Sequence, residues 1–400
     1  MNRHSGSPES TDSSAAVTTP IQFHPNYIPN GAALYLHVPF CTALCDFCAF
    51  KKSLPSPGDW DRYRAGLEAE WESLHFEGTV SSVFWGGGTP GLLKASDILR
   101  IGELINEQVA SGTEWTVELT PLCPTREKLK AWCEIGVNRL SLGVQSFSPR
   151  LLKAMGRPYD PKNLEAIVGE IREAGFKNLN LDLIIAFPGQ TVEELEADLE
   201  QTVALSPDHV SVYCLTLEED TALYTRLTQS GNQPDPDQEA SLYERAWCLL
   251  EEAGFHQYEI SNFAREGSHC NHHLNVWSMG NWRGIGPSAA SQIGSLRFRN
   301  AYDLKKWSEF PFTAAADRYP DLVESSDSDR ALEKIIFGLR KNSGISTDLV
   351  NSLHPTDRDR VKVFLEKLES EGYLVQSKGN YRLTLQGRLL ADEISQQILG

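Results

Sequence analysis

The sequence of 400 residues predicts an α/β protein: a partial (β/α)6 barrel of the TIM type, followed by a winged-helix-like α+β domain. Short runs of β-branched and aromatic residues alternate six times with longer segments of helical periodicity, which is typical of parallel strands joined by helices. Gly136 and Gly175 stand where helices should end, and a strand follows each. Periodicity does not distinguish a barrel from a flat doubly wound sheet, but repeated right-handed crossovers favour a partly closed barrel.

The strands and helices of this barrel can be placed along residues 31–225. The expected strands are Ala33–Val38, Val80–Trp85, Trp115–Leu119, Arg139–Val144, Leu179–Ile185 and His209–Leu215. The expected helices have Leu, Ile, Val or Ala at three- and four-residue spacing, and they are Asp59–His75, Ala95–Val109, Thr125–Glu134, Pro161–Ala174 and Val192–Leu205.

The pattern changes after residue 225, where two further regions are expected. Residues 226–320 form an extension with a loop at 229–237, a helix at Gln238–Ala253 and an aromatic, glycine-rich segment at 258–300. Residues 321–400 have the element order of a winged helix: helices at Asp327–Lys341, Thr347–Ser352 and Thr356–Glu371, strands at Tyr373–Gln376 and Asn380–Thr384, and a last helix ending at Ile398. Mixed charges favour a scaffold or docking role over DNA binding.

Composition narrows the class of protein and its surroundings. A net charge of −17 and a pI near 5.1 argue against a nucleic acid partner, because binding phosphates requires clustered Lys and Arg. No run approaches the ~18 consecutive apolar residues of an integral membrane segment. Residues 1–30 predict a disordered tail, since residues 1–19 are rich in Ser, Thr and Pro and lack the layout of a signal peptide. We therefore expect a cytoplasmic protein in a reducing compartment.

Three cysteines, Cys41, Cys45 and Cys48, follow the first strand. A [4Fe-4S] cluster that only transfers electrons has four protein ligands, so three thiolates leave one iron open to another ligand. A structural zinc site is the main alternative, because Cys45 and Cys48 have zinc-knuckle spacing and His37 could complete a Cys3His set. A disulfide framework is improbable, because three clustered thiols cannot all pair.

Polar and glycine residues recur at the carboxyl ends of the other strands, where βα barrels carry their functional groups. Gly86–Pro90 directly follows the second strand, and its glycines let the backbone approach a ligand closely. The later strands contribute Glu118, Gln145, Asp182 and Thr216. Each of the two carboxylates alone could pair with helix-end amides or a lysine, but together these residues indicate one polar ring above the thiols.

These motifs carry a resemblance. The spacing Cys41-x3-Cys45-x2-Cys48, followed by Gly-Gly-Gly-Thr-Pro, resembles radical S-adenosylmethionine (SAM) enzymes and sets zinc aside. Longer stretches resemble the oxygen-independent coproporphyrinogen III oxidase family and its heme chaperone branch, HemW. They are residues 35–41, 84–90, 141–147, 181–191 and 258–264, and the likeness runs from about Leu34 to the C-terminus.

The resemblance implies cofactors and the residues that bind them. The three thiolates would hold a [4Fe-4S] cluster whose open iron binds the amino and carboxylate groups of S-adenosylmethionine, so that one electron can cleave the sulfonium. By similarity, Tyr35 and Phe47 flank the cluster and adenine region. The methionine part would meet Gly87, Gly88 and Thr89, and the polar shell would be completed by Glu118, Gln145, Arg157, Asp182 and Thr216.

Two features bear on the branch. Phe50 occupies the position where the oxidases carry a further cysteine, which favours the heme chaperone. His272 to Trp277 resembles the heme-binding stretch of that branch, so His272 is the candidate heme ligand. The stretch departs from the pattern at His273 and Val276, which replace Asn and Tyr, and Ala290 replaces a histidine in a later turn. Whether His272 or His273 ligates heme stays open.

The resulting prediction is a heme chaperone that binds a [4Fe-4S] cluster, S-adenosylmethionine and heme, or another tetrapyrrole, and passes heme to an acceptor protein. The acceptor and the electron donor are not identified by the sequence. The alternatives are an oxygen-independent coproporphyrinogen III oxidase of heme biosynthesis and a related radical SAM methyltransferase or cyclopropanase. Four cysteines outside the cluster motif are expected to be ordinary buried small hydrophobes: Cys123, Cys133, Cys214 and Cys248.

Overall fold

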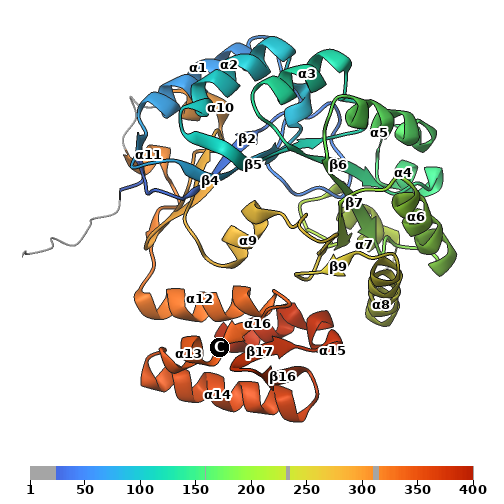
Figure 1. Cartoon of the computed structure of the whole chain (residues 1–400), viewed down its shortest axis with the longest axis vertical. Helices are drawn as coiled ribbons and strands as arrows, with labels where there is room; N and C mark the ends of the chain where they lie inside the picture. Colours follow the sequence, from blue (N-terminus) through green and yellow to red (C-terminus); the bar gives the residue numbers. More distant parts are fainter. Residues whose placement is uncertain (1–23, 158, 231–234, 310–314, 400) are drawn as a thin grey trace, which may run out of the picture.

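The computed structural model describes residues 24–157, 159–230, 235–309 and 315–399 (Figure 1). Most of the expected disordered tail lies outside the described residues. Its end does not: β1 (Tyr27–Ile28) pairs in parallel with β3 (His75–Phe76), within the stretch to residue 30 that we expected to be disordered. The prediction was wrong here because a strand of two residues is too short to be recognised from composition.

The six predicted strands form the parallel centre of a twelve-stranded sheet. They pair in chain order, each with its sequence neighbour. Their bounds are β2 (Ala33–Val38), β4 (Val80–Gly87), β5 (Val109–Leu119), β6 (Arg139–Gln145), β7 (Asn178–Ile185) and β8 (His209–Cys214). The predicted partial barrel of six parallel strands is therefore confirmed.

Helices cover the outer face of this sheet (Figure 1). The predicted ones are α1 (Asp59–Glu72), α2 (Ala95–Asn106), α3 (Arg126–Glu134), α5 (Leu164–Glu173) and α6 (Val192–Ala204). Two shorter helices were not predicted, α4 (Pro149–Ala154) and α7 (Ala222–Ser230). The first is started by Pro149 at its first position and by Ser148, whose side chain accepts from the Leu151 N–H.

The extension after residue 225 adds strands to both sides of the barrel sheet. Strand β11 pairs in parallel with β2, and β10 pairs antiparallel with β8. The elements are α8 (Pro236–Glu252), β9 (His256–Gln257), β10 (Asn262–Ala264), α9 (Asn271–Trp277), β11 (Trp282–Ile285), β12 (Ala290–Ile293), β13 (Leu296–Arg299), α10 (Leu304–Ser308), α11 (Ala315–Arg318) and β14 (Val323–Glu324). No strand was predicted between residues 258 and 300, because the strands there are only three or four residues long.

The two faces of the barrel strands differ in chemistry. Apolar side chains point outward and pack against the helices around the fully buried Trp85, Trp115 and Trp132. The inner face carries buried polar residues at every second position: Ser82, Glu114, Thr116, Arg139, Ser141, Asn180, His209 and Ser211. The barrel therefore has a polar interior below its mouth.

A buried ion pair fixes α1 to the late strands. Glu70 and Arg283 both have side chains that are 0% exposed and lie 2.8 Å apart. The Glu70 carboxylate also accepts from Asn300 Nδ2 (2.8 Å), from Trp307 Nε1 (2.8 Å) and from the Gly286 N–H (2.9 Å). One carboxylate thus ties α1 to β11, α10 and the connections beside them.

The C-terminal unit has its own core and the predicted winged-helix order, with one additional strand and with two helices in place of the single last helix. Its elements are α12 (Asp327–Leu339), β15 (Ile345–Ser346), α13 (Thr347–Asn351), α14 (Pro355–Ser370), β16 (Leu374–Ser377), β17 (Asn380–Leu383), α15 (Leu385–Leu389) and α16 (Ala391–Leu399). Helix α9 lies between this unit and the barrel, where Trp277 packs against Phe337 with ring centroids 5.9 Å apart (Figure 1). Within the described residues, no helix has the length and apolar character needed to cross a membrane.

The cysteines outside the cluster motif only partly match their prediction. Cys123 is buried and Cys214 is half-buried, but Cys133 and Cys248 are exposed. Both exposed cysteines lie in helices, Cys133 in α3 of the barrel and Cys248 in α8 of the extension, and neither is on the buried face of its helix. Burial of these two was wrongly predicted because a free cysteine carries too little hydrophobicity to fix its helix face.

Candidate functional site

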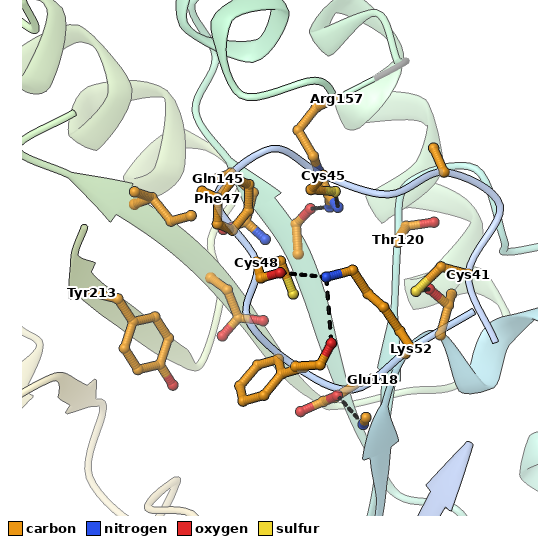
Figure 2. Close-up of a pocket in the computed structure, with 18 of the residues that line it drawn as sticks. Cys41, Cys45, Phe47, Cys48, Lys52, Glu118, Thr120, Gln145, Arg157 and Tyr213 are labelled. Carbon is orange, nitrogen blue, oxygen red and sulfur yellow. Dashed lines mark hydrogen bonds between the residues drawn. The ribbon is translucent and has the colours of Figure 1, made fainter. Parts of the chain in front are cut away.

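A cavity of about 550 Å³ opens at the carboxyl ends of the barrel strands (Figure 2). The structure brings together almost all of the residues that the sequence singled out. Those that line the cavity are Cys41, Cys45, Phe47, Cys48, Gly87, Gly88, Thr89, Glu118, Gln145, Arg157, Asp182 and Thr216. Tyr35 and His272 are not among the lining residues.

The cysteines lie on the loop after β2. The Thr89 hydroxyl lies 3.7 Å from Cys41 Sγ, and Arg157 Nη1 lies 3.3 Å from Cys45 Sγ. Lys52 Nζ donates to the Cys48 carbonyl at 2.5 Å. Burial raises the pKa of the Cys41 thiol, and the hydrogen bond from the Thr89 hydroxyl partly offsets this rise. The two nearby cations would stabilise thiolates or other anions at this loop.

The chemistry of these donors fits an iron-sulfur cluster better than a single ion. Among the described residues, no three or more His, Cys, Asp or Glu side chains lie close enough together to hold a single metal ion. A zinc ion requires such convergence, because all of its ligands bind one atom. A [4Fe-4S] cluster binds each thiolate through a different iron, so three thiols spread along one loop suit it.

The glycines after β4 are required by close backbone approach. Gly87 has φ of +106°, and a Cβ there would lie 2.5 Å from the His37 ring. A Cβ on Gly88 would lie 2.6 Å from the Phe40 carbonyl oxygen, a backbone atom that cannot move aside cheaply. Alanine is therefore excluded at both positions, and the bare backbone forms one wall of the cavity.

Two carboxylates face the cavity from neighbouring parts of the barrel. Glu118, at the end of β5, accepts from the Gly87 N–H at 3.1 Å. Burial, together with the negative charge of Asp182, raises the pKa of Glu118 to about 7. Asp182, on β7, accepts from Ser141 Oγ at 2.9 Å and from Asn180 Nδ2 at 2.7 Å. The pair can accept hydrogen bonds from hydroxyl or ammonium groups of a ligand.

Gln145 has a strained backbone at the end of β6. Its φ is +68°, and the register with β7 shifts between Gly143 and Gln145, as in a β-bulge. A bulge redirects a side chain, and a non-glycine residue with positive φ is typically retained at functional sites. Arg157 packs beside it and donates from Nη2 to the Gly143 carbonyl at 2.8 Å (Figure 2). The strained position thus presents the amide of Gln145 to the cavity.

Tyr35 and His272 lie below the cavity. The Tyr35 hydroxyl lies 3.1 Å from His37 Nδ1, and its ring packs near Phe84 and His272. His272 is buried in α9, where its Nδ1 lies 3.1 Å from Ser82 Oγ, and burial lowers its pKa to about 3. The next residue, His273, lines the cavity instead. No helix was predicted in this segment, and α9 turns the two imidazoles in different directions.

Several cavity residues were not singled out from the sequence. They are Lys52, Thr120, Tyr159 and Tyr213. A signal existed for Tyr213, because alternation along β8 places it on the inner face with His209 and Ser211. For His273 no sequence signal separates it from its neighbour, since the helix itself was not predicted.

Comparison with known proteins gives a consistent result. Residues 35–202 match the Radical SAM superfamily, and residues 326–390 match the HemN C-terminal domain. The chain is 34% identical over 375 residues to heme chaperone HemW of Bacillus subtilis, covering 92% of this chain and 98% of the relative. It is 31% identical over 387 residues to the mitochondrial radical S-adenosyl methionine domain-containing protein 1 of Danio rerio, covering 92% and 87%.

A solved structure shares the fold. The coproporphyrinogen III oxidase HemN of Escherichia coli, described as a radical SAM enzyme, matches with a TM-score of 0.79 at 24% identity, covering 94% of this chain and 91% of that chain.

Proposed function

Since this chain belongs to the HemW family of radical SAM proteins, we propose that it is a heme chaperone that binds a [4Fe-4S] cluster, S-adenosylmethionine and heme, and passes heme to acceptor proteins. The observation that carries the proposal is the set of residues that line one cavity. The cavity is lined by three cysteines on one loop, by a polar shell from the strand ends, and by an imidazole from α9.

The residues of the cavity divide into two sets. Cys41, Cys45 and Cys48 would hold the cluster, which supplies an electron and an open iron when bound. The backbone at Gly87 and Gly88 lines the cavity and would lie beside the ligand, and the absence of Cβ atoms there lets it pack against His37 and Phe40. The carboxylates on β5 and β7 accept hydrogen bonds from ligand hydroxyl or ammonium groups.

For heme, the geometry favours His273 over His272. His272 is buried and does not line the cavity, whereas His273 does. Neutral imidazole is the usual protein ligand of heme iron, and burial lowers the pKa of His273. Apolar groups at the same cavity, Phe50 and Leu122, are 71% and 55% exposed and offer a surface to a macrocycle.

The experiment compares two single variants in anaerobically reconstituted protein titrated with heme. His273→Ala should weaken heme binding, and His272→Ala should leave the heme absorption band in place. An unchanged spectrum in His273→Ala would remove this residue as the ligand. If His272→Ala alone loses heme, the family's expected ligand is correct and the orientation of α9 must change on binding.

The second candidate is coproporphyrinogen III oxidase activity, favoured by the shared fold with HemN. Phe50, at the position where oxidases carry a further cysteine, is 71% exposed at the cavity mouth and offers no thiol there. Anaerobic incubation with coproporphyrinogen III separates the two functions. Stoichiometric release of carbon dioxide with formation of protoporphyrinogen would refute the chaperone proposal.

The proposal includes a reducing cytosol as the working compartment. All eight cysteines are free thiols, and cluster ligands must stay reduced until the cluster is inserted. The acceptor and the electron donor are not part of the proposal, because nothing in the cavity identifies them.

A further inference from the structure

A row of hydrogen bonds inside the barrel connects the start of α9 to the cavity. The backbone N–H of Cys270 donates to the Tyr258 hydroxyl at 3.3 Å, and this hydroxyl lies 2.8 Å from His209 Nε2. His209 Nδ1 lies 2.6 Å from Asn180 Oδ1, and Asn180 Nδ2 donates to Asp182 Oδ1 at 2.7 Å. Four of the five groups are buried, and only Asp182 reaches the cavity.

The direction of every bond in this row is fixed by its two ends. A backbone N–H can only donate, and a carboxylate can only accept. Asn180 must therefore turn its NH2 group toward Asp182 and its carbonyl oxygen toward His209, so His209 Nδ1 carries the hydrogen. Burial lowers the pKa of His209 well below its ordinary value, so the ring is neutral and Nε2 accepts from Tyr258.

Two serines reinforce the same orientation. Ser141 Oγ accepts from Asn180 Nδ2 at 2.7 Å and donates to Asp182 Oδ2 at 2.9 Å. Ser211 Oγ donates to Asn180 Oδ1 at 3.2 Å. Both hydrogens of the Asn180 amide group are thereby used, and both carboxylate oxygens of Asp182 receive a donor. Flipping the Asn180 amide would point its oxygen at a carboxylate, which electrostatic repulsion opposes.

We propose that His209 and Tyr258 are positioning residues for ligand binding in the cavity. They hold the Asn180 amide so that Asp182 is presented to the ligand in one orientation. Asp182 keeps lone pairs free for a hydroxyl or ammonium donor of the ligand. Tyr258 also binds Cys270, the N-cap residue directly before α9, so the helix that carries His273 and the Asp182 carboxylate are both held by one row of bonds. The inference rests on the proposed binding of S-adenosylmethionine.

The first test is the tautomer of His209 in metal-free protein labelled with 15N-histidine. The parent should show the Nδ1–H neutral form, assigned with His209→Gln. In Tyr258→Phe the Nε2 resonance should shift downfield, because that nitrogen loses its donor. An Nε2–H tautomer in the parent, or no shift in Tyr258→Phe, would overturn the inference.

The second test is the affinity of reconstituted protein for S-adenosylmethionine, measured by anaerobic equilibrium dialysis. Tyr258→Phe should bind about tenfold more weakly, as expected for one lost buried hydrogen bond. Tyr243→Phe is the matched control, because its hydroxyl also accepts from a backbone N–H, that of Cys214 at 2.9 Å, outside this row. Ser211→Ala should stay within about twofold of the parent, since His209 still donates to Asn180.

Equal affinities of Tyr258→Phe and the parent would refute a positioning role. Equal losses in Tyr258→Phe and Tyr243→Phe would also refute it, because a general loss of stability would then explain both. If the parent protein binds no S-adenosylmethionine, the proposed function is refuted instead. The tautomer of His209 then tests the direction of the hydrogen bonds in the row independently of ligand binding.

Discussion

Glu118 should make the protein less stable as the pH rises through neutrality. Burial and the neighbouring charge of Asp182 raise the pKa of Glu118 to about 7, from an ordinary value of 4.5. The folded state therefore holds this proton more tightly than the unfolded state. Stability from this group is complete below pH 4.5, falls as the pH rises, and is lost above pH 7.

The size of the effect follows from the two pKa values. Between pH 5 and pH 8, the linkage relation gives a loss of about 2–3 kcal/mol in the free energy of unfolding. Glu118→Gln removes the titration but keeps an amide oxygen that can accept from the Gly87 N–H. The variant should therefore gain about 2–3 kcal/mol on the parent between these two pH values.

The assay is urea unfolding of the metal-free protein at pH 5 and pH 8, followed by tryptophan fluorescence. Trp85 and Trp115 are fully buried in the barrel core and report on this part of the molecule. The control is Glu200→Gln, because Glu200 is exposed on α6. If Glu118→Gln and the parent change equally with pH, the carboxyl is not protonated in the folded protein and the reasoning fails.

Three further predictions concern other parts of the molecule. Gly88→Ala should lower the affinity for S-adenosylmethionine at least about tenfold in equilibrium dialysis. Gly169→Ala is the control, because a Cβ there meets nothing within 4 Å, and it should not change this affinity. Equal affinities of the two variants would refute the close approach of the Gly88 backbone to Phe40. Arg283→Met should lower the free energy of unfolding by about 3–5 kcal/mol in urea, because it leaves the buried Glu70 carboxylate without its cation. Adding Glu70→Met should recover part of this loss. An Arg283→Met variant as stable as the parent would contradict this prediction. Cys48→Ala should abolish the absorbance of the reconstituted cluster and Cys133→Ala should retain it, and the reverse result would mean a different ligand set.

The barrel was predictable from the sequence because its strands have a simple pattern. Strand β2 has the predicted bounds, and the other parallel strands differ at their ends by a few residues, β5 most. Periodicity works here because one face of each strand meets helices and the other the barrel interior. The strands of the extension, such as β11, were not predicted, because they are stabilised by pairing with a distant strand and not by their own composition.

The cavity was predictable where a residue follows a predicted strand directly. Glu118 and Asp182 both line it, as the common edge of parallel strands requires. That His273 rather than His272 lines the cavity was not predictable, because it depends on the rotation of α9. That rotation is set by tertiary contacts, among them Glu114, which accepts from the His272 N–H at 3.0 Å.

The pairing of β11 with β2 has a consequence for biosynthesis. Trp282 lies opposite Ala33, so the strand that pairs with this edge of β2 is synthesised 249 residues after it. Until then β2 has an unpaired edge, which is a template for association with other chains. Contacts of such long range also slow folding. A chain ended at residue 225 would contain every cysteine of the cluster motif and most of the cavity lining, yet it would keep this open edge and be prone to aggregate.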